Sequence, residues 1–235
     1  MSGSEPDPHS GRPVGLEVDA RPAERPGPVV LTGRFGRIEK LDAGRHGAAL
    51  WQALKDDDAT WAYLGYGPFA DAAAFAAWLA ERAKLEDPYS YAVLEPPGRA
   101  VGIVTLMEIR PAMRVIEVGN IVYSPALQRT PLATEAQYLL ARYVFETLGH
   151  RRYEWKCNAL NAPSRCAAER FGFTFEGVFR QHLIVKGRNR DTAWFSMLDS
   201  EWPACKRAFE RWLAPDNFDA AGRQRISLRE LNSAG

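Results

Sequence analysis

The sequence contains few cysteines and no pattern that would hold a metal. Cys157, Cys166 and Cys205 are an odd number of widely spaced thiols in 235 residues. This pattern argues against a disulfide framework and is typical of a reducing compartment. The four histidines are scattered and form no recognisable ligand spacing with the cysteines. We therefore expect a protein without disulfides and without a structural metal.

Long apolar runs and an excess of one charge are also missing. No apolar stretch approaches the roughly 18 residues that a membrane span needs, and the N-terminus lacks the apolar core of a signal peptide. The formal net charge is +1, so the total charge does not favour nucleic acid or a membrane surface as a partner. These absences predict a cytoplasmic protein that binds neither nucleic acid nor membrane.

The apolar residues that are present are unevenly distributed. They make up 46% of the chain, which is enough for a real core. Residues 1–28 are rich in proline, glycine, serine and charge, and this composition predicts a disordered arm. We expect one domain at residues 29–200, because no repeat or linker interrupts it, and a C-terminal helix and tail packed on it at residues 201–235.

Hydrophobic periodicity predicts helices and strands in mixed order. Apolar spacings of three and four indicate helices at 42–54, 71–85, 133–149, 161–172 and 200–213. Asp42 and Asp71 stand where N-caps are expected. Strand patterns occupy 29–41, 89–95, 100–109, 115–123 and 153–157, and residues 178–198 form a hairpin pattern that turns near Gly187. The predicted fold class is mixed α/β, that is, α+β.

The stretch NIVYSPALQRTPLATEA, residues 120–136, joins the end of a strand to the first turn of a helix. Unpaired amides and the helix dipole favour an anion at such a junction. Pro131 stands in the turn and has no N–H to offer. We interpret the junction as a modified anion site. The alternative is a structural turn that has lost its ligand.

Two motifs in this order resemble the GCN5-related N-acetyltransferase (GNAT) family. They are ATEA after the turn and N-A-P-S followed by E-R-F-G-F and E-G at residues 161–177. Within the family, residues 29–200 are most similar to the branch of ribosomal-protein N-terminal acetyltransferases. The resemblance implies a mixed, mostly antiparallel sheet that splays between its fourth and fifth strands, with helices on both faces. It also implies acetyl-CoA as co-substrate in the gap and no metal.

The resemblance further implies which residues contact the coenzyme. The family holds the pyrophosphate on a Q/R-x-x-G-x-G/A turn, which corresponds to residues 128–133, and Pro131 stands where the first glycine belongs. The pantetheine arm is held by the fourth strand and by the asparagine of N-A-P-S. The implied contacts are Ile121, Tyr123, Gln128, Arg129, Thr130, Leu132, Ala133, Thr134 and Asn161.

Acetyl transfer needs a base for the amine and a proton or hydrogen bond for the departing thiolate. By resemblance, Ser164 serves the thiolate, although it could be only a helix-start serine. The tyrosine acid of many relatives corresponds to Ala168 and is absent. Glu117 is one candidate base on the fourth strand. His182 is another, because the glutamate of the ribosomal-protein branch corresponds to its neighbour Leu183. The base stays open.

The segment DDDATWAYLGYGPF, residues 56–69, is the candidate acceptor site. Carboxylates and the aromatic faces of Trp61, Tyr63 and Tyr66 suit a cationic amine, but for the aspartates we favour a solvated acidic loop. We expect acetyl transfer to a primary amine of a small molecule or a protein N-terminus, by direct attack in a ternary complex. One alternative is a non-catalytic protein that has lost CoA, and another is transfer of a different acyl group. A homodimer is one assembly considered.

Overall fold

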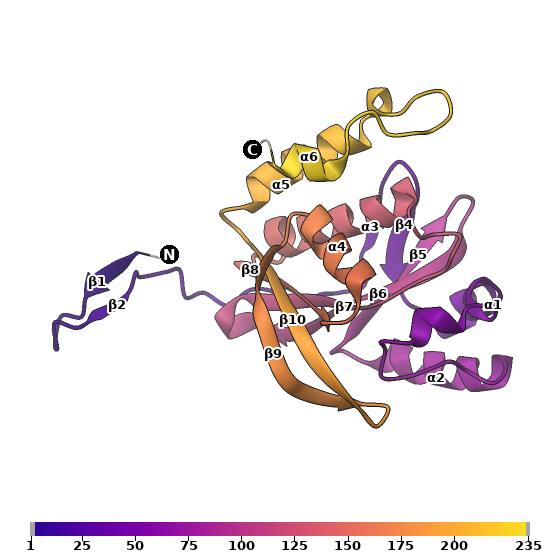
Figure 1. Ribbon diagram of the computed structural model, residues 1–235, viewed down its shortest axis with the longest axis horizontal. Coiled ribbons are helices and arrows are strands. Elements are labelled where there is room, and N and C mark those ends of the chain that lie inside the picture. Colours follow the sequence, from indigo (N-terminus) through magenta and orange to yellow (C-terminus); the bar gives the residue numbers. More distant parts are fainter. Residues whose placement is uncertain (1–2, 234–235) are drawn as a thin grey trace.

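A single large sheet organises the computed structural model, which describes residues 3–233 (Figure 1). Within these residues the sheet has eight strands in the order β3-β4-β5-β6-β7-β8-β10-β9, and only the β7–β8 pair is parallel. The mixed, mostly antiparallel fold class is confirmed. The strands are β3 Val30–Thr32, β4 Arg37–Lys40, β5 Tyr89–Glu95, β6 Arg99–Arg110, β7 Val115–Tyr123, β8 Arg152–Asn158, β9 Thr174–Val185 and β10 Arg188–Leu198.

Helices cover both faces of this sheet (Figure 1). The Asp42 and Asp71 side chains cap the first two, because they accept the amides of Arg45 and Ala74 at 2.8 Å each. The α-helices are α1 Ala43–Leu54, α2 Ala72–Lys84, α3 Pro131–Arg142, α4 Ala162–Arg170, α5 Trp202–Leu213 and α6 Leu228–Ser233. Shorter turns are η1 Asp58–Trp61, η2 Pro111–Met113, η3 Tyr143–Thr147 and η4 Pro215–Asn217.

The core is divided between the two faces. Ile116 and Val118 of β7 pack with Leu139 of α3 on one face, together with α4 and α5. On the other face, Val122 of β7 packs with Leu50 of α1 and with α2. Each fully buried aliphatic side chain contributes about 1.5–3 kcal/mol through burial. The sheet therefore separates two layers, and the ends of β7 and β8 lie between them.

The sheet opens between β7 and β8. The parallel pairing joins only Val115–Val118 to Arg152–Trp155. Beyond it, β7 continues to Tyr123 along β6, and β8 continues to Asn158 along β10. The two strands diverge because each follows a different neighbour. The resemblance implied a splay between the fourth and fifth strands of the family. These strands correspond to β7 and β8, and the splay is present between them.

Helix α3 begins at Pro131, two residues before the predicted start. Thr130 caps it, because its Oγ1 accepts the Ala133 amide at 3.2 Å, and Pro131 occupies the first turn, where no N–H is needed. The helix was predicted to continue to residue 149, but α3 ends at Arg142 and is followed by the wider turn η3. In this turn the Leu148 amide donates to the Tyr143 carbonyl at 3.0 Å. Gly149 follows with a φ of 73°, as a helix stop requires.

The N-terminal segment, which the composition predicts to be a disordered arm, contains a short hairpin and a stretch that follows the domain. Strands β1 Ser4–Pro6 and β2 Pro13–Gly15 pair in a hairpin that stands away from the domain (Figure 1). Residues 23–27 then follow the domain surface: the Ala23 amide donates to the Pro111 carbonyl at 3.1 Å and the Glu24 amide to the Leu148 carbonyl at 2.8 Å. Main-chain hydrogen bonds hold this part, which composition does not reveal.

The C-terminal region adds one helix that the periodicity did not predict. Helix α6 packs on α5 and α4, with Leu228 completely buried. The Asn232 side chain donates to the carbonyl of Arg170 at 2.9 Å. With six residues, α6 is too short to show a helical period of its own, so only its packing against α5 reveals it.

Candidate active site

The turn between β7 and α3 is held by its own side chains. Gln128 Nε2 donates to the Tyr123 carbonyl at 2.9 Å, and Arg129 has a left-handed φ of 62°. The Ala133 amide is capped by Thr130, and the Thr134 amide donates to the Thr130 carbonyl at 3.4 Å. Within the described residues the Leu132 amide has no partner in the protein. Of the amides of Leu132, Ala133 and Thr134 at the start of the helix, that of Leu132 is therefore the free one.

The start of α4 lies after β8, on the α3 face of the sheet. The Asn161 side chain accepts the Ser164 amide at 3.2 Å, which is the N-capping role considered for it. Trp155 Nε1 of β8 donates to Ser164 Oγ at 3.0 Å. The hydroxyl thus accepts from the indole, and it also makes a hydrogen bond with the Cys157 side chain. This geometry is compatible with a hydrogen bond from Ser164 to a thiolate.

Glu117 lies on the face of the sheet opposite to α3 and Ser164. Its neighbours Ile116 and Val118 pack toward α3, and side chains alternate along a strand. Its carboxylate is 5% exposed and 2.9 Å from Lys156 Nζ. The same ammonium is 3.1 Å from Glu154. Burial raises the pKa of Glu117 to about 7, although the Lys156 ammonium opposes that rise. A carboxylate that titrates near neutrality is suited to accept a proton from an amine.

Glu154 differs from Glu117 because it has three cationic partners. Arg110, Arg152 and Lys156 each lie within 3.1 Å of its carboxylate. Burial alone would raise the pKa of Glu154, but the hydrogen bonds and charges of these partners lower it below the ordinary value. The pKa values of the two neighbouring carboxylates are therefore shifted in opposite directions.

His182 is not brought to Glu117. Its Nδ1 lies 3.0 Å from Thr192 Oγ1, and its ring packs against Phe179 and Trp194. The Lys156 ammonium lies over the Trp194 ring, 4.1 Å from the ring centroid. An indole therefore separates His182 from the Glu117–Lys156 pair. The geometry gives Glu117 the better position of the two candidate bases.

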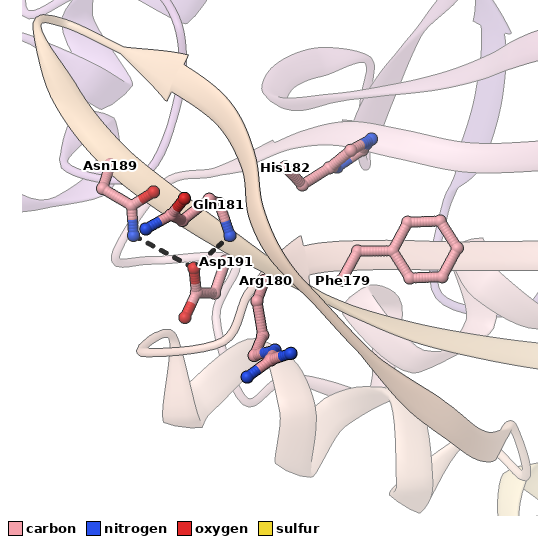
Figure 2. Close-up of a pocket in the computed structure, with 6 residues that line it drawn as sticks. All are labelled: Phe179, Arg180, Gln181, His182, Asn189 and Asp191. Atoms are coloured by element: carbon pink, nitrogen blue, oxygen red, sulfur yellow. Dashed lines mark hydrogen bonds between the residues drawn. The ribbon is translucent and has the colours of Figure 1, made fainter.

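A hollow of about 790 Å³ lies on the β9–β10 hairpin (Figure 2). Asp191 Oδ1 organises one side, where it accepts the Gln181 amide at 2.7 Å and Asn189 Nδ2 at 3.0 Å. In Figure 2 the side chains of His182 and Arg180 point away from each other. They do not converge on one ligand, so this hollow carries little weight as a catalytic pocket.

The predicted acceptor segment contacts both sides of the splay between β7 and β8. Trp61 is buried and packs with Tyr66, and Tyr66 Oη donates to Asn120 Oδ1 of β7 at 3.2 Å. Tyr63 Oη donates to the Leu160 carbonyl at 3.3 Å. Lys186 Nζ, at the tip of the β9–β10 hairpin, donates to the Trp61 carbonyl at 2.9 Å. The segment therefore touches β7, the β8–α4 connection and the hairpin.

Sequence reasoning missed Lys156 and Asn120 in this region. Asn120 has a φ of 48° and sits at an irregularity in the β6–β7 pairing. A glycine followed by asparagine inside a strand pattern is a signal for such a bulge, and it was available in Gly119–Asn120. Lys156 had no comparable signal. Asp56 and Asp58 are exposed, as the solvated reading of the loop expected.

Two further observations concern the described residues only. Across residues 3–233, no set of three or more His, Cys, Asp or Glu side chains is grouped so that it could hold a metal ion. No helix in that range combines the length and apolar character that crossing a membrane requires.

Comparison with known proteins identifies the family. Residues 38–174 match the family model described as the acetyltransferase (GNAT) domain, which is more than half of the chain. This chain belongs to that family, as the sequence motifs indicated. A GCN5-related N-acetyltransferase from Brucella melitensis has a crystal structure with a TM-score of 0.88 and 50% identity, over 91% of this chain and 98% of its own.

Two other relatives support the same assignment. A probable GNAT-family acetyltransferase from Chromobacterium violaceum is 44% identical over 84% of this chain and 100% of its own, with a TM-score of 0.77. A Bacillus subtilis protein named "Putative ribosomal N-acetyltransferase YdaF" is 30% identical over 105 residues, 45% of this chain. The chain spans only 57% of the length of that curated relative.

Proposed function

We propose that this protein transfers an acetyl group from acetyl-CoA to a primary amine by direct attack in a ternary complex. The observation that carries the proposal is the splay between β7 and β8, with Glu117 on one face of the sheet and Ser164 on the other. A thioester lying in the gap would meet an amine on the Glu117 face and a hydroxyl donor on the Ser164 face.

Each residue then has a defined part in the reaction. Acetyl-CoA supplies the activated acetyl group. Glu117 accepts the proton that the amine loses as its nitrogen bonds to the carbonyl carbon. Main-chain groups around Ile121 would align the pantetheine arm and polarise the carbonyl, because β7 has no β8 partner beyond Val118. Ser164 donates to the sulfur as the carbon–sulfur bond breaks, in place of the tyrosine that Ala168 replaces.

The turn after β7 is the proposed site of the pyrophosphate. The Leu132 amide is a free donor, and Arg129 adds an exposed cation beside it. Pro131 removes one donor, and a hydrogen bond to a charged acceptor is worth about 1.5–3 kcal/mol. The Thr130 hydroxyl is already used to cap α3, so it can contact the phosphate only as an additional partner.

The acceptor is a primary amine of one of two kinds. The segment that contains Trp61, Tyr63 and Tyr66 is tied to both sides of the splay, and a closed mouth favours a small amine. The name of the Bacillus subtilis relative favours a protein N-terminus instead. We propose a small-molecule amine as the acceptor. The hydrogen bonds that favour it are made by this chain, whereas the name belongs to a relative. The cytoplasmic location and a homodimer remain predictions.

Calorimetric titration with acetyl-CoA, followed by an amine screen monitored by free-thiol release, tests the function. We expect acetyl-CoA to bind and one class of primary amine to release thiol. The second candidate, a non-catalytic CoA-free relative, is favoured by Pro131 and Ala168, and absence of binding at millimolar acetyl-CoA would establish it. Parallel reactions with other acyl-CoA thioesters distinguish acetyl transfer from transfer of a different acyl group.

A further inference from the structure

Arg190 and Trp194 of β10 lie on the same face of the sheet as Glu117. Trp194 pairs with Lys156 of β8, and the Lys156 ammonium lies 4.1 Å from the ring centroid of Trp194. The same ammonium is 2.9 Å from the Glu117 carboxylate. Arg190 stands an even number of residues before Trp194, and side chains alternate along a strand. Strand β10 therefore adds a cation and an indole to the face that carries the proposed base.

Each of these two side chains holds a buried hydrogen-bond donor that no protein group accepts. Arg190 Nε and Trp194 Nε1 are both shielded from solvent, and neither has a partner in the part of the chain that the structure describes. Unpaired buried polar groups are few in native proteins, and each calls for an explanation. Two such donors on one strand, both beside the proposed base, are explained by a ligand that completes their hydrogen bonds.

The Arg190 guanidinium also lacks a close counter-ion. Within residues 3–233 it makes no salt bridge, and the Glu117 carboxylate is bonded to Lys156 instead. Burial lowers the pKa of the Arg190 guanidinium, and the nearby Cys157 and Glu117 offset this fall only in part. One positive charge on this face is therefore available to an anionic ligand.

The predicted acceptor segment contacts the hairpin close to Arg190. Lys186 Nζ, near the turn that precedes Arg190 along the chain, donates to the Trp61 carbonyl at 2.9 Å. Tyr66 of the same segment reaches β7, where its Oη donates to Asn120 Oδ1 at 3.2 Å. The proposed acceptor site is therefore bordered by β7 and by the part of the hairpin that leads into Arg190.

We propose that Arg190 and the Trp194 indole bind a carboxylate of the acceptor, so that the substrate is a small amine that also carries a carboxylate. This inference rests on the proposed function, because it concerns the acceptor of that reaction. A guanidinium matches a carboxylate with two parallel hydrogen bonds, and the indole N–H donates a further one. One unpaired cation matches one negative charge, which favours a carboxylate over a doubly charged phosphate. The amine then lies at Glu117, and the carboxylate lies toward Arg190.

Steady-state acetylation of matched amines tests the proposal. Each pair consists of an amino acid and its amide, which has the same length and no carboxylate: glycine and glycinamide, β-alanine and β-alaninamide, γ-aminobutyrate and γ-aminobutyramide. Free-thiol release at saturating acetyl-CoA gives the ratio of kcat/KM for the acid to kcat/KM for the amide. The proteins are the wild type, Arg190→Gln, Arg190→Lys, Trp194→Phe and the control Arg188→Gln. Arg188 is a matched control because it is an exposed arginine on the same strand.

We expect the wild type to prefer the acid of at least one pair by about tenfold or more, because the amide leaves the guanidinium unpaired. Arg190→Gln should remove this preference, mainly by raising KM for the acid, and should change the amide little. Arg190→Lys should keep part of the preference, since it keeps the charge and loses the planar fork. Trp194→Phe should reduce the preference severalfold. Arg188→Gln should leave it unchanged.

The outcomes separate this proposal from the function on which it rests. A wild type that acetylates acids and amides equally, or only neutral amines, overturns the carboxylate site and leaves the acetyltransferase standing. A folded Arg190→Gln with the wild-type ratio does the same. A wild type that binds no acetyl-CoA and releases thiol with no amine overturns both. If thermal unfolding shows that Arg190→Gln does not fold, Arg190→Lys decides, because an unchanged ratio in that variant overturns the site.

Discussion

The Glu117 carboxylate and the Lys156 ammonium form the most distinctive pair of side chains in this molecule. Both are largely buried, and Lys156 is shared with Glu154 on the neighbouring strand. A buried carboxylate normally keeps its proton, whereas a nearby ammonium favours ionisation. The balance leaves Glu117 with a pKa of about 7, so its protonation state changes near physiological pH.

Glu117→Gln should lower kcat about a hundredfold, because the amide cannot accept the proton of the amine. In the wild type, activity should rise with pH through about 7, since only the ionised carboxylate acts as base. The variant should lack this rise. Steady-state rates between pH 5.5 and pH 8.5 measure it.

Glu154→Gln is the informative control for that profile. Glu154 raises the pKa of Glu117 by charge repulsion, so its removal should keep the rise and move it to lower pH. A Glu117→Gln enzyme that retains the wild-type profile would exclude Glu117 as the base and return attention to His182 or to water.

Ser164→Ala should reduce turnover roughly tenfold to a hundredfold, because a hydrogen bond to the developing thiolate is lost. The dissociation constant of acetyl-CoA should change little, since the hydroxyl acts mainly after the thioester is attacked. Single-turnover kinetics and calorimetry separate the two quantities. Cys166→Ala, an exposed change on the same helix, should behave as the wild type. A wild-type rate for Ser164→Ala would remove this serine from the mechanism.

Helix α3 connects the fold to the site through its first turns. Glu135, part of the ATEA motif, is 3% exposed and accepts the amides of Arg34 and Phe35 at 2.6 and 2.8 Å. It thereby holds the turn between β3 and β4 against the helix. The motif that resembles the family at this point therefore has a structural part, while Thr130 and Pro131 shape the turn just before it.

Pro131→Gly should tighten acetyl-CoA binding up to about tenfold, because it restores one main-chain donor at the helix start. It should also destabilise the protein by about 0.5–1 kcal/mol, since glycine loses more backbone freedom on folding. Calorimetry and thermal unfolding measure the two effects. Pro203→Gly in the first turn of α5 should show only the second. Weaker binding in Pro131→Gly would mean that the proline ring itself shapes the site.

Across the whole molecule, the N-terminal region divides into a projecting hairpin and a segment bound to the domain. Deletion of residues 1–18 should leave the melting temperature unchanged, because β1 pairs with β2 rather than with the main sheet. Deletion of residues 1–28 should lower it by several degrees, since it removes the main-chain bonds of Ala23 and Glu24 and the Tyr91 Oη bond to the Gly27 carbonyl.

Scanning calorimetry of the two deletions gives the comparison directly. A large loss of stability from the shorter deletion would contradict the division, because it would show that the hairpin is bound to the domain. Equal melting temperatures for both deletions would show that the segment near residue 24 contributes nothing measurable.

Local patterns were sufficient to predict most of the elements. The caps Asp42, Asp71 and Asn161 lie where the helices begin, and the pairs of strands separated by short turns were found because such patterns depend on neighbours in sequence. The start of α3 was placed two residues late, because a proline at a helix start was given too little weight. The main-chain contacts of Ala23 and Glu24 with the domain were not predicted, because their partners are distant in sequence.

The order of residues in this chain was enough for most of its helices and strands, because these depend on short-range spacing, and its motifs indicated the family. The geometry of the proposed site comes from contacts between distant segments. Lys156 beside Glu117, Trp155 on Ser164 and Arg170 on Thr134 each join residues from separate elements. Burial and charge at such contacts set the pKa of Glu117, and no spacing along the chain encodes them.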